Sequence, residues 1–137
     1  MEYKKFGNTL IVRLDRGEEV VDRLLELARR EHITLASVNG LGAADDVTVG
    51  VYFPATQEYK YNQLQGEYEI ISLHGTITTQ EDQPYGHFHM SIGDQEGRVF
   101  GGHLNRAVIS ATCELVVTLL EGRVERRMDP EIGLNLM

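Results

Sequence analysis

The clearest hydrophobic pattern along the chain lies between residues 18 and 32 and predicts one helix. Apolar residues recur there at the three- and four-residue spacing of a helical face, and charged residues fill the other side. The apolar set is Val20, Val21, Leu24, Leu25, Leu27 and Ala28. The basic pair Arg29-Arg30 suits the negative end of a helix dipole, so we expect the helix to end near Glu31-His32.

Strand patterns occupy most of the remaining chain. We expect strands at residues 9–14, 33–39, 47–53, 58–61, 68–78, 85–93, 98–104, 107–120 and 123–128. Gly40-Leu41-Gly42 separates two of them and is expected to serve a tight bend or close subunit packing. One helix among many strands indicates an α+β fold, a mainly antiparallel β-sheet with the helix packed on it. We expect a single domain over residues 1–137, with an irregular tail from about residue 129.

A predicted hairpin carries three of the five histidines. His87 and His89 point to the same face of its first strand, because side chains alternate along a strand. A three-residue turn that uses Gly97 as its left-handed residue places His89 opposite His103. In this register the three histidines share a polar face, and the opposite, apolar face consists of Phe88, Met90, Ile92, Phe100 and Leu104.

Three neighbouring imidazoles predict a metal site. Neutral imidazole is a common ligand for zinc, and a site of His87, His89 and His103 leaves a fourth position open, as in catalytic or exchangeable zinc sites. Gly101 and Gly102 would let a ligand or another backbone approach closely. The alternative is that these histidines are ordinary polar residues on a solvated or subunit-facing surface.

Composition narrows the function classes. The single cysteine, Cys113, excludes an internal disulfide and lies among alternating apolar residues, which favours a buried structural thiol. No apolar run reaches bilayer-spanning length and no signal-peptide core follows the first residues, so a cytoplasmic protein is expected. The formal net charge of −8 makes direct DNA binding doubtful, because that binding draws its affinity from Lys and Arg.

Four segments carry a family resemblance: SVNGLGA at 37–43, GEYEIISLHG at 66–75, HFH at 87–89 and GRVFGGHL at 97–104. With them the chain resembles the plants-and-prokaryotes-conserved (PPC) domain family, the domain of plant AT-hook nuclear proteins, over nearly its full length. The resemblance implies a compact α+β domain that forms a homotrimer, with the histidine motifs near a subunit boundary. It also implies metal ligation, expected as one zinc per chain, by His87, His89 and His103.

The DNA-binding element of the plant proteins has no counterpart in these 137 residues. Plant members place an Arg-Gly-Arg-Pro core in a separate segment that enters the minor groove, and this sequence contains none. The resemblance is therefore to a prokaryotic stand-alone member without an AT-hook.

Three functions remain open at the level of sequence. The first is a trimeric metal-binding module that acts through a small-molecule ligand or a protein partner. The second is a zinc-dependent, hydrolase-type enzyme in which Glu69 or Glu114 is the general base or a fourth ligand, unless both glutamates simply face outward from half-exposed strands. His74 either lines the same pocket or is an ordinary strand-end histidine. No pattern selects a reaction type.

The third function is a DNA-binding or DNA-associated transcriptional regulator. It requires basic side chains gathered on one face: Arg13, Arg16, Arg106, Arg123, Arg126 and Arg127. The last three alternate with Glu121 and Glu125, which is typical of a solvated strand edge.

Overall fold

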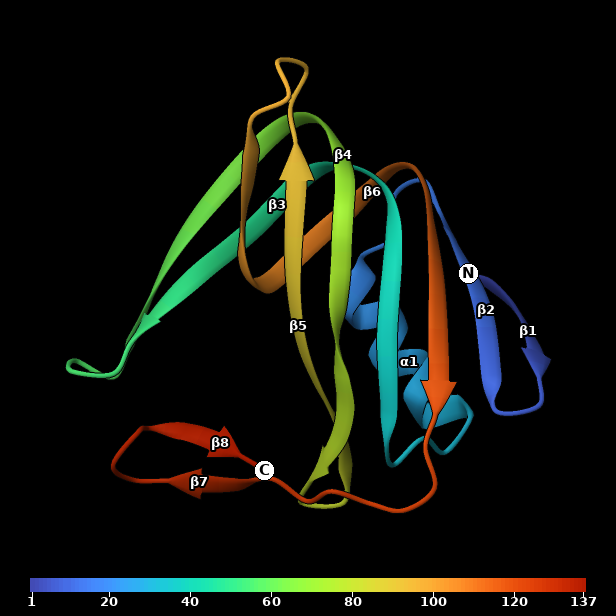
Figure 1. Ribbon diagram of the computed structural model, residues 1–137, viewed down its shortest axis with the longest axis vertical. Coiled ribbons are helices and arrows are strands. Elements are labelled where there is room, and N and C mark those ends of the chain that lie inside the picture. The colour runs from blue at the N-terminus through green and yellow to red at the C-terminus, as the bar shows by residue number, and fades with distance from the viewer.

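A six-stranded antiparallel sheet with one helix against it forms the framework of the protein (Figure 1). The computed structural model describes all residues from 1 to 137. The sheet order is β1-β2-β6-β3-β4-β5, and β5 also pairs with β6, so the long strands close on one another. The strands are β1 (Glu2–Phe6), β2 (Thr9–Asp15), β3 (Ala36–Phe53), β4 (Glu58–Gln80), β5 (Gln83–Gly93) and β6 (Val99–Leu119). The predicted α+β class is confirmed.

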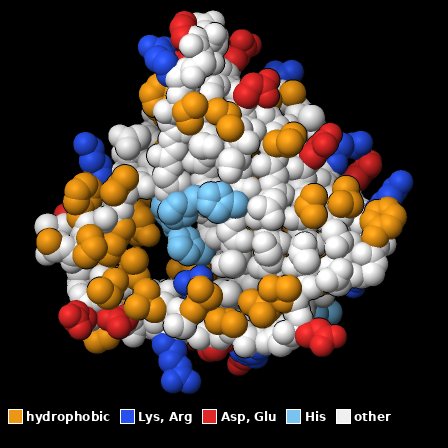
Figure 2. All heavy atoms as spheres, viewed as in Figure 1, with side chains coloured by type: hydrophobic (Ala, Val, Ile, Leu, Met, Phe, Trp, Pro, Cys, Tyr) orange, Lys and Arg blue, Asp and Glu red, His pale blue; other side chains and the backbone are white.

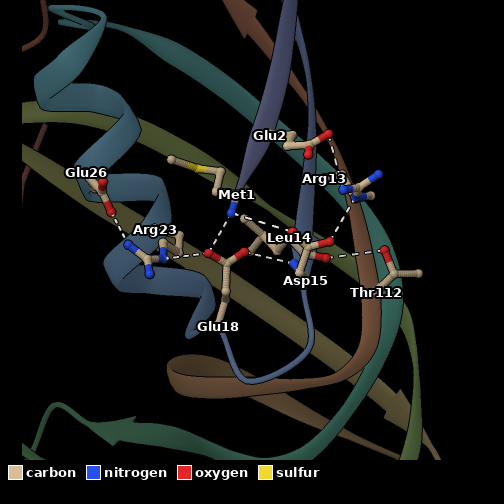
Figure 3. A network of polar contacts seen from close by, with 9 residues as sticks. All are labelled: Met1, Glu2, Arg13, Leu14, Asp15, Glu18, Arg23, Glu26 and Thr112. Atoms are coloured by element: carbon tan, nitrogen blue, oxygen red, sulfur yellow. Dashed lines mark hydrogen bonds and ion pairs between the residues drawn. The ribbon is translucent and has the colours of Figure 1, made fainter.

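The helix α1 (Val20–Arg30) has the bounds that its pattern predicts. Glu19 caps it, because its carboxylate accepts a hydrogen bond from the Asp22 amide at 2.7 Å. The neighbouring Glu18 accepts from the Met1 amino group at 2.6 Å and pairs with Arg23 at 3.0 Å (Figure 3). These contacts hold the start of the helix against the first two strands. The protein has no helix with the length and apolar character that crossing a membrane requires.

Several predicted strands merge into longer ones. Segments 33–39 and 47–53 become β3, 58–61 and 68–78 become β4, and 98–104 and 107–120 become β6. The expectation that Gly40-Leu41-Gly42 separates two strands is wrong, since the chain passes through it as one continuous strand with a register shift between Gly40 and Gly42. A Cβ on Gly42 would lie 2.4 Å from the Thr112 carbonyl oxygen, so these glycines serve close packing of β3 on β6.

Both ends of the chain differ from the prediction. The charged segment that forms β1 was not predicted as a strand, because an exposed edge strand carries little apolar signal. The tail is not irregular: β7 (Arg127–Asp129) and β8 (Leu134–Leu136) pair as a small hairpin. Arg126, expected on a solvated strand edge, is only 6% exposed because this hairpin folds back over it.

The core lies between one face of the sheet and α1. It contains 25 buried apolar residues, and burial alternates along the strands as the sequence predicts. Cys113 is fully buried in this core, as expected, and burial raises the pKa of its thiol to about 12. The other, outer face of the sheet carries polar side chains, including the histidines, and exposed apolar ones such as Ile11 and Val116.

Candidate metal centre

The predicted hairpin register is confirmed, and it brings histidines from two neighbouring strands together. His89 of β5 lies directly opposite His103 of β6. Gly97 has the positive φ of 76° that the turn requires, and the Asp94 amide donates to the Arg98 carbonyl at 3.0 Å. The local turn chemistry therefore sets which side chains meet across the two strands.

The apolar side of this hairpin is buried with one exception. Phe88, Met90 and Ile92 are 2% exposed or less, and Leu104 is 4% exposed. Phe100 was predicted on the same face but is 38% exposed. Its part of β6 leads to the hairpin tip, which projects beyond the region that α1 covers (Figure 1).

His87, His89 and His103 form one compact cluster. The ring centroid of His87 lies 5.3 Å from that of His89 and 5.2 Å from that of His103, and the remaining pair is 5.7 Å apart. One ligand nitrogen from each lies within 4.8 Å of the other two. Zinc holds imidazole nitrogens at about 2.0–2.1 Å, so small side-chain rotations suffice for one ion to contact all three.

Partial desolvation favours the neutral, metal-binding form of these imidazoles, although the side chain of His89 is exposed. It lowers the pKa of His87, with a further contribution from the positive charge of Arg126. Burial likewise lowers the pKa of His89, with His74 adding to the effect. Burial and the other two histidines lower the pKa of His103 to about 4. All three side chains are therefore ready to offer a lone pair at neutral pH.

His103 supplies the observation that tests whether a metal fits. Its Nδ1 is buried and has no hydrogen-bond partner in the chain. Such a nitrogen is costly to bury unless something coordinates it. The ring of Tyr59 lies 5.0 Å from the imidazole and limits its movement. A Cβ on Gly102 would lie 2.6 Å from the Gly50 carbonyl oxygen, so this glycine allows the close strand approach predicted for it.

The histidines line a hollow of about 310 Å³. Figure 2 shows them as one pale blue group beside it. Glycine, apolar and tyrosine residues form the rest of its lining, among them Tyr52 and Leu134. No carboxylate lines it. A volume of this size suits a small molecule.

The structure does not bring the two candidate glutamates to this hollow. Glu69 and Glu114 are both exposed and line two other depressions of the surface. His74 is nearer: it lies opposite His89 on the neighbouring strand, with ring centroids 6.2 Å apart. Its Nδ1 lies 3.3 Å from Ser72 Oγ, so it borders the cluster without joining the group of three.

Sequence reasoning missed three contributors to the site. Tyr59 and Leu134 line the hollow, and Arg126 acts electrostatically on His87. Their distance along the chain from the histidine motifs left no spacing signal. The only cue in the sequence was Arg126 itself, which is one of three arginines in the short charged segment 121–127.

The comparisons with known proteins cover most of the chain. The family model of the Plants and Prokaryotes Conserved (PCC) domain matches residues 1–121. A Bacteroides thetaiotaomicron protein for which DNA binding has been proposed has a TM-score of 0.96 and 32% identity, covering 98% of this chain and 94% of its own. A metal-containing protein from Archaeoglobus fulgidus has a TM-score of 0.89 and 31% identity, covering 99% and 97%.

A curated relative contains a similar sequence within a longer protein. The bifunctional protein GlmU of a Synechococcus strain is 30% identical over 126 residues. The match covers 89% of this chain and 19% of GlmU. The chain therefore spans a small part of that relative.

Proposed function

This chain belongs to the Plants and Prokaryotes Conserved (PCC) domain family, and from that premise we propose that it is a homotrimeric metal-binding protein. It holds one zinc ion per chain through His87, His89 and His103 and acts through a small ligand or a protein partner. The observation that carries this proposal is the convergence of three neutral imidazoles, one with a buried unpaired nitrogen. The similarity to the metal-containing Archaeoglobus protein supports it.

The donor set favours zinc or a similar transition metal. Calcium and magnesium prefer oxygen ligands, and no carboxylate lines the hollow. Zinc acts as a Lewis acid and lowers the pKa of a bound water. Glu69 and Glu114 lie in other depressions, so no general base from this chain accompanies the histidines. Binding is therefore favoured over hydrolysis.

Direct binding to duplex DNA is not favoured for this chain, although DNA binding has been proposed for the Bacteroides relative. Arg13, Arg106 and Arg123 form ion pairs with acidic side chains of the same chain. Arg126 is buried. Together with the formal net charge of −8, this leaves few cations for phosphate contacts.

Metal analysis of the untagged protein tests the proposal. We expect about one zinc per chain by plasma mass spectrometry, its removal by a chelator and its return when zinc is added back. A His32→Ala variant, which alters a histidine outside the cluster, serves as the control. Protein that takes up no zinc or other transition metal after chelation and reloading would contradict the proposal.

Exposed apolar side chains on the outer face of the sheet, the face opposite α1, support the proposed trimer. Ile11 of β2 and Val116 of β6 lie opposite one another there and are 46% and 42% exposed. They share a cross-strand row with Asn39, His74 and His89, so this apolar pair lies on the same face of the sheet as the histidines. Light scattering should give the mass of three 15.4 kDa chains, and Val116→Glu should yield monomers. A wild-type monomer at micromolar concentration would exclude the trimer.

A further inference from the structure

A buried arginine beside the histidine cluster has one nitrogen without a partner. Arg126 is 6% exposed. Its Nε donates to Thr78 Oγ1 at 2.8 Å, its Nη1 donates to the Asn135 carbonyl at 2.9 Å, and its guanidinium lies 5.0 Å from the centroid of the Tyr85 ring. Its Nη2 is buried and makes no hydrogen bond. A buried charged donor of this kind calls for an acceptor from outside the chain.

Two contacts place this guanidinium at the border of the hollow. Tyr85, on which it lies, is two residues before His87 in β5, so the two side chains share a face. Asn135, which accepts from Arg126, follows Leu134, and Leu134 lines the hollow.

The buried unpaired side-chain atoms of the protein gather in this one region. There are three: His103 Nδ1, Arg126 Nη2 and Asn135 Oδ1. His103 lines the hollow, and the other two residues are joined by the hydrogen bond at its border. Elsewhere the chain pairs its buried polar side chains, so the polarity left over here marks a ligand site.

We propose that the hollow binds a small monocarboxylate whose negative charge is shared between Arg126 and the metal held by the histidines. This inference rests on the proposed metal-binding function. A carboxylate has two oxygens, one for Arg126 Nη2 and one for the metal, whereas a phosphate would bring further oxygens for which the lining supplies few donors. Val51, Tyr52 and Leu134 in the lining suit a short apolar tail.

An NMR titration of the zinc-loaded protein tests this, with butyrate as the probe and neutral butyramide as its matched control. Butyrate is expected to shift the amide signals of the hollow saturably, and butyramide to bind at least about tenfold more weakly. Arg126→Gln should weaken butyrate binding about tenfold or more, because a charge-assisted hydrogen bond is lost. Arg127→Gln removes the same charge from an exposed neighbour and should leave the affinity unchanged.

The outcomes separate the two proposals. Protein that takes up no metal before the titration overturns the metal-binding function and this inference together. If the zinc-loaded protein does not bind butyrate, or binds butyramide equally well, the proposed carboxylate site alone is overturned. Butyrate binding that survives in Arg126→Gln overturns the role of Arg126. If Arg126→Gln loses its folded spectrum, Arg126→Lys is titrated in its place. Stronger binding of butyrate than of butyramide to the wild type still supports the site.

Discussion

Replacing any one of His87, His89 and His103 with alanine is expected to lower the affinity for zinc at least about a hundredfold. Loss of a residue that merely orients a ligand costs roughly 10- to 100-fold, and a direct ligand contributes more. Each variant leaves only two imidazoles in a hollow that no carboxylate lines, so no acidic side chain is at hand to replace the missing ligand. Competition with a chromophoric chelator measures the affinity.

Two other histidines provide the controls for this series. His74 borders the cluster, with its ring 6.2 Å from that of His89, and His32 follows the end of α1. Alanine at His32 should leave zinc affinity unchanged, and alanine at His74 should change it by less than about tenfold. Zinc should also raise the melting temperature of the wild type and not of the three ligand variants, since a ligand stabilises only the state that binds it. Equal affinities across all five variants would show that the metal lies elsewhere.

Phe88→Ala is expected to lower the free energy of unfolding by about 3–5 kcal/mol. Phe88 is 1% exposed and lies between the two histidines of β5. A Cβ on Gly86 would lie 2.4 Å from its ring, and one on Gly75 would lie 2.8 Å from it, so the ring covers two glycines that have no side chains to fill the gap. The site can collapse little, which favours the upper part of this range.

Phe6 is the matched control for that substitution. It is 61% exposed on the edge strand β1, so Phe6→Ala should cost less than about 1 kcal/mol. Urea denaturation followed by circular dichroism gives both values. Because burial of Phe88 turns His87 and His89 toward the other face, Phe88→Ala should also weaken zinc binding. A loss of stability no larger than that of Phe6→Ala would mean that Phe88 does not anchor this strand.

The histidine cluster could be predicted because its causes are local. A turn that needs a left-handed residue at Gly97 and an apolar alternation through Phe88 both require His89 to face His103. A shift of one residue would have moved His103 into the core. Two independent constraints agreed, and the structure has the register that satisfies both.

The length of the strands could not be predicted in the same way. In the sequence, the glycines of β3 look like a tight bend between two strands, because glycine serves turns and bulges equally well. Only the tertiary packing of Gly42 against Thr112 of β6 determines that these glycines form a bulge. The edge strand β1 escaped prediction for a related reason, since its stability comes from pairing with β2 and not from its own pattern.

The sequence by itself determined the α+β class, the helix, the hairpin register and the three clustered histidines, because each depends on periodicity or turn chemistry within a short segment. Only the tertiary structure decided which charged groups accompany them. It brought the tail back so that Arg126 is buried beside His87, and it left Glu69 and Glu114 at other depressions. Contacts between residues far apart in sequence depend on how the long strands bend and close on one another, and no local pattern encodes that path.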